Sequence, residues 1–105
     1  MSDMTAQSSI LMLHDVGLHA RPSVKLTKLA KGFSGRVELA VAEGGPWIDA
    51  KSIVKVMAAK APRGTVLHFR AEGGDAQAAV DALVALVARD FVDGAQQGQG
   101  NDASG

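Results

Sequence analysis

Strand-like and helix-like hydrophobic patterns alternate along this chain in the order βαββαβα. Four segments show the two-residue alternation or the short apolar run of strands: residues 10–14, 36–41, 47–50 and 65–71. Three segments have helix-starting residues or apolar side chains at helical spacing: residues 20–31, a shorter segment from Ser52 that stops before Pro62, and a last one capped by Asp75. This order predicts an α+β open-faced two-layer sandwich. Its antiparallel sheet has four strands, with three helices on one face and water on the other.

The same patterns predict which side chains form the core. Alternate residues of a strand point to the same face, so we expect Leu67 and Phe69 to point inward and His68 outward. In the helices, the apolar stripe recurs every three or four residues. The expected core contains these residues: Ile10, Met12, Leu26, Ala30, Phe33, Leu67, Phe69, Val80, Leu83, Val84 and Val87.

Length and charge limit the domain organisation and the class of function. The 105 residues suit one domain at 10–91, between an N-terminal extension (1–9) and a disordered tail or linker (92–105). Eleven basic residues balance eleven acidic ones, so the composition gives no sign of nucleic-acid binding. There is no cysteine, no signal-peptide pattern, and no apolar run near the roughly 18 residues of a membrane span. We therefore expect a soluble cytoplasmic protein that is not inserted in a membrane, and we take a monomer as the default.

Residues 17–22, Gly-Leu-His-Ala-Arg-Pro, place a histidine where a helix is about to begin. Gly17 permits a tight loop, and Pro22 suits a first helical turn, where an N–H would have no partner. The free N–H groups of that turn favour phosphate oxygens, and Arg21 adds a planar cation. His19 is therefore a candidate phosphoryl carrier. A plain helix-capping histidine beside a surface arginine is the alternative that this chemistry leaves open.

Three stretches, in order along the chain, resemble one known family: residues 17–22, Ala50-Lys51-Ser52-Ile53 and Arg63-Gly64-Thr65-Val66. They are similar to the HPr family, the phosphocarrier proteins of the bacterial phosphoenolpyruvate-dependent sugar phosphotransferase system. The resemblance runs from about Ile10 to Phe91 and implies the HPr-like form of the sandwich described above.

The resemblance implies a function for the histidine and its neighbours. Enzyme I, charged by phosphoenolpyruvate, would phosphorylate Nδ1 of His19, and His19 would pass the phosphoryl group to IIA-type components. Arg21 would contact the phosphoryl group, and the loop and helix start would help to hold it: Gly17, Leu18, Ala20 and Pro22. Such a protein is an intermediate in phosphoryl transfer rather than an independent enzyme. Because there is no Walker loop and no histidine spacing typical of a metal site, we expect no cofactor and no metal.

Ser52 has two interpretations that are compatible with each other. A serine before the run Ile-Val-Lys-Val-Met is a good helix N-cap, which contributes about 1 kcal/mol relative to alanine. The resemblance implies that Ser52 is also a regulatory phosphorylation site for an HPr kinase/phosphorylase. A phosphate there would add negative charge to the partner-facing surface and slow the phosphorylation of His19.

The segment after Ser52 is unusually apolar for a short helix. Either it is a buried helix, or, as the resemblance implies, Ile53, Val54 and Met57 form an exposed patch that docks Enzyme I and the sugar-specific enzymes II. Lys28 and Lys55 would then be basic neighbours of that patch.

The chain departs from the family pattern at a few places. Val16 stands where many members have Asn or Thr, the turn at 43–46 is longer, and Lys60 stands where glycine is usual. These departures concern regulation and the choice of partner. Two other functions remain open: an HPr-like domain of a longer phosphotransferase (a multiphosphoryl transfer protein or the subunit that serves dihydroxyacetone kinase), and a regulatory binding module.

Overall fold

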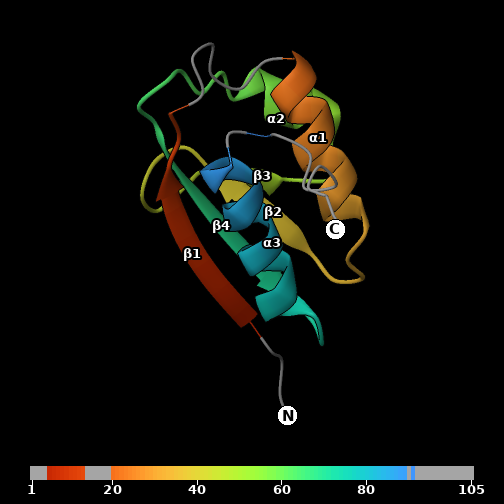
Figure 1. Cartoon of the computed structure of the whole chain (residues 1–105). Helices are drawn as coiled ribbons and strands as arrows, with labels where there is room; N and C mark the ends of the chain where they lie inside the picture. The colour runs from red at the N-terminus through yellow and green to blue at the C-terminus, as the bar shows by residue number, and fades with distance from the viewer. Residues whose placement is uncertain (1–4, 14–19, 90, 92–105) are drawn as a thin grey trace, which may run out of the picture.

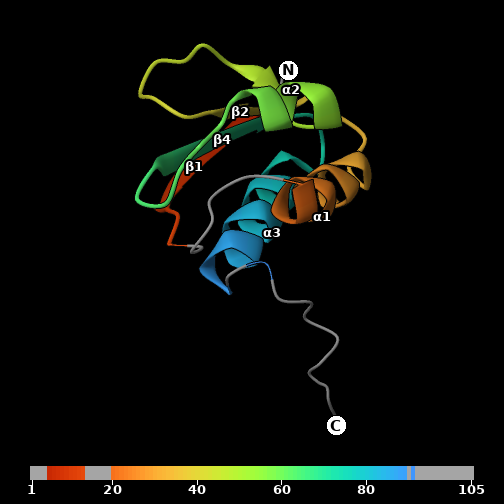
Figure 2. The ribbon, with the colours of Figure 1, turned by 90° about the horizontal axis from the view of Figure 1, so that it is seen from above.

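The computed structural model describes residues 5–13, 20–89 and 91 and confirms the α+β sandwich (Figure 1). The elements are β1 (Thr5–Leu11), α1 (Ala20–Lys31), β2 (Val37–Ala40), β3 (Ile48–Asp49), α2 (Ile53–Ala58), β4 (Val66–Glu72) and α3 (Ala76–Ala88). The sheet has the strand order β1-β4-β2-β3, and every neighbouring pair is antiparallel. Viewed from above, α1 and α3 form a second layer against one face of the sheet, while the short α2 packs between α1 and β3 (Figure 2).

The first strand begins earlier than the sequence indicates. We predicted a strand at 10–14, but β1 starts at Thr5 and pairs with β4 from Thr5↔Glu72 to Leu11↔Val66. Its side chains alternate between exposed and half-buried along the whole strand, with Ala6 and Ser8 on the inner side. These small or polar side chains give no hydrophobic alternation in the sequence. Five residues of the expected N-terminal extension therefore belong to the sheet.

The core lies between the sheet and the two longer helices. Its largest fully buried side chains include Phe69 and Leu67 of β4, Leu39 of β2, Leu26 of α1 and Leu83 of α3. The predicted core is confirmed. Most of its members are buried, and the others pack against the buried cluster as half-buried side chains: Ile10, Phe33 and Val84.

The end of the second helix and the capping of the third differ from the prediction. The second helix ends at Ala58 rather than just before Pro62, and Lys60 adopts a positive φ of 51° that cannot continue a helix. Asp75 occupies the N-cap position of α3, but its side chain makes no capping bond. Instead, Asp75 Oδ2 accepts hydrogen bonds from the backbone N–H of Ser34 (3.1 Å) and from Ser34 Oγ (3.4 Å). Asp75 therefore ties the loop after α1 to the start of α3.

Candidate functional site

The N-terminal turn of α1 contains three of the six residues predicted for the phosphoryl site, Ala20, Arg21 and Pro22. The helix begins at Ala20, as predicted, so the residue that follows His19 is already helical. Arg21 is exposed, whereas Pro22 is buried at the third helical position, where its missing N–H costs no helical hydrogen bond. His19, Gly17 and Leu18 lie outside the described residues.

A shallow hollow of about 580 Å³ lies at this end of α1, lined by Ala20, Arg21, Val24 and Lys25. The N–H groups of a first helical turn have no partner within the helix, and together with the positive end of the helix dipole they favour an anion here. Neither α1 nor α2 contains an acidic residue, and together they carry five basic ones: Arg21, Lys25, Lys28, Lys31 and Lys55. The electrostatics of the two helices therefore suit a phosphoryl group and an acidic partner.

Two buried hydroxyls on α1 are features that the sequence analysis missed. Ser23 and Thr27 lie on the inner side of α1 with Leu26 and Ala30, and neither hydroxyl has a hydrogen-bond partner among the described residues. Their spacing of four, in phase with Leu26 and Ala30, is the signal that could have placed them inside.

Ser52 is confirmed as the N-cap of α2. It is half-buried and has extended backbone angles (φ −104°, ψ 111°), and its Oγ accepts a hydrogen bond from the N–H of Lys55 at 3.3 Å. The preceding residue is fixed as well: Lys51 Nζ donates to the carbonyl oxygen of Phe33 (2.6 Å), and the Lys51 N–H donates to Asp49 Oδ1 (2.9 Å). The start of α2 is thereby held against the turn after α1 and the end of β3.

The second helix exposes most of its apolar side chains. Val54 is 74% exposed and Met57 is 40% exposed, while Ile53 is half-buried and only Val56 is fully buried. The interpretation of this segment as a buried helix is therefore wrong. Lys55 is exposed on the same helix, so a basic side chain borders the apolar ones, as expected.

The structure brings α2 and the start of α1 to the same end of the molecule. Figure 1 shows α2 beside the N-terminal part of α1, and the two helices are in contact. Lys28 is exposed on α1, as is Val24 (53%). By contrast, His68 lies on the open face of the sheet, as predicted, opposite Ser9 of β1 and Ala40 of β2. His68 is therefore separated from the two helices by the sheet.

The described residues contain neither a membrane-spanning helix nor a cluster of metal ligands. No helix in residues 5–13, 20–89 and 91 is long and apolar enough to cross a membrane. Within the same residues, no three histidine or acidic side chains lie close enough together to hold a metal ion.

Comparison of the sequence with known proteins identifies the family of the chain. Residues 6–89 match the family model for the HPr component phosphorylation site of the phosphotransferase system. The chain is 41% identical to the phosphocarrier protein HPr of Cupriavidus necator over 88 residues, which cover 84% of this chain and 97% of that protein. It is 44% identical to HPr of Haemophilus influenzae over 71 residues, 68% of this chain and 81% of that one.

Solved structures agree with the sequence comparisons. HPr-C-His from Thermoanaerobacter tengcongensis superposes with a TM-score of 0.75 at 31% identity, over 82% of this chain and 94% of that one. The histidine-containing phosphocarrier protein of a Mycoplasma superposes with a TM-score of 0.73 at 33% identity, over 85% of this chain and all of that one. The chain thus belongs to the HPr family of phosphocarrier proteins of the phosphotransferase system.

Proposed function

We propose that this protein accepts a phosphoryl group from phospho-Enzyme I on Nδ1 of His19 and passes it to IIA-type components of the phosphotransferase system. The observation that carries the proposal is the junction at residue 20. In a member of the HPr family, the second half of the Gly-Leu-His-Ala-Arg-Pro stretch forms the start of α1, which begins at the residue after His19.

The chemistry needs one nucleophile and one anion site. A neutral imidazole nitrogen attacks phosphorus, an N–P bond forms, and the bond from phosphorus to Enzyme I breaks, with its electron pair leaving on Enzyme I. The N–H groups in the first turn of α1 and the exposed guanidinium of Arg21 are suited to hold the phosphoryl oxygens. Transfer to a IIA-type component is the same exchange with His19 as the leaving group. No step requires ATP or a metal ion.

The decisive experiment is phosphate incorporation from labelled phosphoenolpyruvate in the presence of Enzyme I. The unmodified protein should acquire acid-labile label, and His19→Ala should acquire none. His68→Ala is the matched control, because it removes a histidine from the open face of the sheet and should be labelled normally. If the folded parent stayed unlabelled beside another HPr that the same Enzyme I phosphorylates, the carrier function would be excluded.

The basic and apolar face formed by α1 and α2 is the proposed docking surface for these partners. The side chains that we assign to it are Ile53, Val54, Met57, Lys28 and Lys55. Exposed apolar side chains bordered by cations suit brief contact with an acidic partner, because charge speeds the encounter and the apolar area is small.

Ser52 is the proposed site of regulatory phosphorylation by an HPr kinase/phosphorylase. Its place at the start of α2, next to the docking surface, supports the proposal, because a phosphate there adds negative charge where partners are expected to be acidic. Incubation with such a kinase and ATP should label the parent on an acid-stable phosphoserine. Ser52→Ala should remain unlabelled, and phosphorylated parent should react more slowly with Enzyme I than unphosphorylated parent.

One comparison favours a second candidate, in which the same carrier domain belongs to a longer phosphotransferase. The chain is 43% identical over 68 residues to the multiphosphoryl transfer protein of Vibrio cholerae, and those residues are 64% of this chain but 17% of that protein. The mass of the protein isolated from its own cells separates a small cytoplasmic carrier, which is our first proposal, from a domain of a larger chain.

A further inference from the structure

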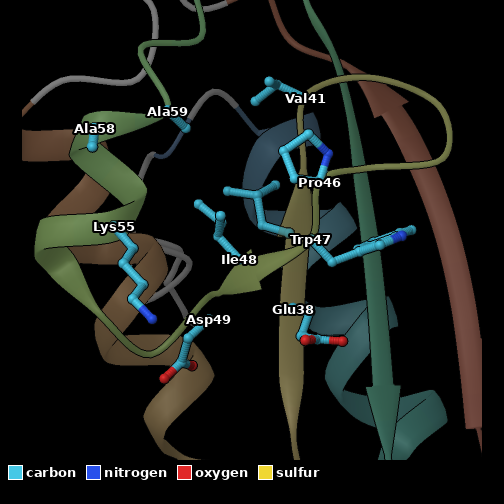
Figure 3. Close-up of a pocket in the computed structure, with 10 residues that line it drawn as sticks. Glu38, Val41, Pro46, Trp47, Ile48, Asp49, Lys55, Ala58 and Ala59 are labelled. Atoms are coloured by element: carbon cyan, nitrogen blue, oxygen red, sulfur yellow. The ribbon is translucent and has the colours of Figure 1, made fainter.

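A pocket lies on the flank of α2 that faces β3. It has a volume of about 630 Å³, and its wall contains residues of α2, β3 and the turn between β2 and β3. Figure 3 shows Ala58 of α2 and Ala59, the residue after the helix, on one side and Pro46 and Ile48 on the other, with Val41 at the upper end. Apolar atoms thus form most of the wall, and the size is within the roughly 300–1,000 Å³ range of protein ligand pockets.

One wall of the pocket is held rigidly by side-chain contacts. Arg70 Nε donates to Glu38 Oε1 at 2.7 Å, and the guanidinium of Arg70 lies 4.2 Å from the centre of the Trp47 ring. Glu38 and Trp47 both line the pocket. Because the charge of Glu38 is already paired with Arg70, it adds little unpaired negative potential to the pocket.

The pocket is continuous with the proposed docking surface. Lys55 and Ala58 line the pocket and are exposed, and Val54 lies one helical turn before Ala58 on the same helix face. A partner that covers Val54 therefore passes over Ala58 and reaches the opening of the pocket. The shallow apolar patch and the deeper pocket form one surface across α2.

The charges select the kind of partner. Lys55 is the basic side chain at the pocket, and α1 and α2 together hold only basic charged residues. Asp49 also lines the pocket, and its Oδ1 accepts the N–H of Lys51 in the turn before α2, a bond that holds this carboxylate in place without cancelling its charge. An apolar side chain next to a carboxylate therefore fits best, with the carboxylate near Lys55.

We propose that this pocket, defined by Val41, Pro46, Ile48, Ala58 and Ala59, receives an apolar anchor side chain from the acidic surface of phospho-Enzyme I. The anchor has the size of leucine or phenylalanine, and an adjacent carboxylate pairs with Lys55. The inference rests on the proposed phosphocarrier function and adds to it a second point of attachment, on the side of α2 away from α1.

The test fills the pocket without touching the core. Ala58→Leu places three extra carbon atoms at the pocket, and Ala78→Leu makes the same change at an exposed position of α3, which does not line the pocket. Phosphorylation of each variant by Enzyme I is measured as KM and kcat for the carrier. We expect Ala58→Leu to raise KM by about five- to tenfold with kcat unchanged, because an anchor is worth more than 1 kcal/mol. Ala78→Leu should behave like the parent.

Trp47 supplies an independent readout, because the chain contains one tryptophan and that residue lines the pocket. Fluorotryptophan in the parent should give one fluorine NMR signal that shifts when Enzyme I is added, and the shift should be lost in Ala58→Leu. The pocket proposal requires both results. The pocket proposal would be overturned by equal KM values for the two leucine variants, or by a fluorine signal that does not shift when the carrier is saturated with Enzyme I. Neither result would contradict the proposed phosphoryl transfer. A parent that Enzyme I does not phosphorylate would overturn both proposals.

Discussion

The side chain of Ser52 caps the N-terminus of α2, a helix that has few other hydrogen bonds. With six residues, α2 can form only a small number of internal hydrogen bonds, so the bond from the Lys55 N–H to Ser52 Oγ is a large share of its local stability. The same oxygen atom is the one that a kinase would modify. Its structural contribution and its proposed regulatory role can therefore be separated by substitution.

We expect Ser52→Ala to lower the free energy of unfolding by about 0.5–1 kcal/mol, because it removes the cap. Ser52→Asp should retain most of the stability, since a carboxylate also accepts the N–H group and interacts well with the helix dipole. Urea denaturation of the three proteins measures the difference. A Ser52→Ala variant as stable as the parent would mean that the cap contributes nothing.

Gly35 lies where two segments approach too closely for any side chain. A Cβ at this position would overlap the carbonyl oxygen of Glu72 at the end of β4. The nearby bond from the Glu72 N–H to the Arg36 carbonyl (2.9 Å) fixes the same junction. Glycine is required here for space rather than for an unusual φ.

We therefore expect Gly35→Ala to destabilise the protein by about 2 kcal/mol or more, because the backbone at residue 35 and the end of β4 have to move apart. Gly74→Ala is the matched control: its Cβ would meet nothing within 4 Å and its φ is not positive. Thermal unfolding compares the two variants with the parent. Similar melting temperatures for both would contradict the close approach at Gly35.

The sequence predicted the roles of residues that act on their neighbours in the chain better than it predicted contacts between residues far apart in the chain. The cap at Ser52 and the helix start at Ala20 were predictable because both depend on neighbours in the sequence. The bonds from Ser34 to Asp75 were not, since the two residues are 41 positions apart and an aspartate before a helix is typical of a cap. The pocket beside α2 was missed for the same reason, because its walls come from separate segments.

At the scale of elements, α2 is a helix whose apolar side is turned mostly toward solvent. Only Val56 among its apolar side chains is fully buried, so changes at Val54 should affect binding without affecting folding. This arrangement contributes little to the core and provides a surface for partners.

Val54→Asp should change the free energy of unfolding by less than about 0.5 kcal/mol, because the side chain is 74% exposed. The same change should raise the KM of Enzyme I for the carrier, since it places a negative charge on the surface that is expected to meet an acidic partner. Urea denaturation and steady-state transfer kinetics measure the two effects. A loss of stability as large as the loss of transfer would contradict the docking role.

The strands show where hydrophobic patterns are a sufficient guide and where they are not. β4 alternates Leu67 and Phe69 with polar residues and was predicted to within one residue at each end. β1 was predicted five residues too late, because Ala6 and Ser8 are too small or too polar to mark its inner face. Their place in the sheet comes from backbone pairing with β4.

At the scale of the whole molecule, one core under one sheet carries the stability. Phe69 is fully buried at the centre of that core, while its neighbour His68 points to the open face. A domain of this size has a total stability of only about 5–15 kcal/mol, so one large core side chain is a substantial part of it.

We expect Phe69→Ala to lower the free energy of unfolding by about 3–5 kcal/mol, through lost burial and the cavity that remains. His68→Ala, one residue away on the other face, should change it by less than about 1 kcal/mol. Urea denaturation measures both variants. Comparable losses of stability in the two variants would mean that His68 is packed in the protein rather than facing solvent.

The strand order also bears on how the protein is made. Both β1 and β2 bond to β4, one along each of its edges, and β4 is synthesised after every other strand. A growing chain therefore leaves the ribosome with its first strand unpaired until residues 66–72 have emerged. The segment that carries His19 follows β1 in the sequence, so the strand before it gains its pairing partner only after residues 66–72 have been synthesised. Early release of the chain would yield a polypeptide that contains the whole phosphorylation motif and has no sheet to hold it.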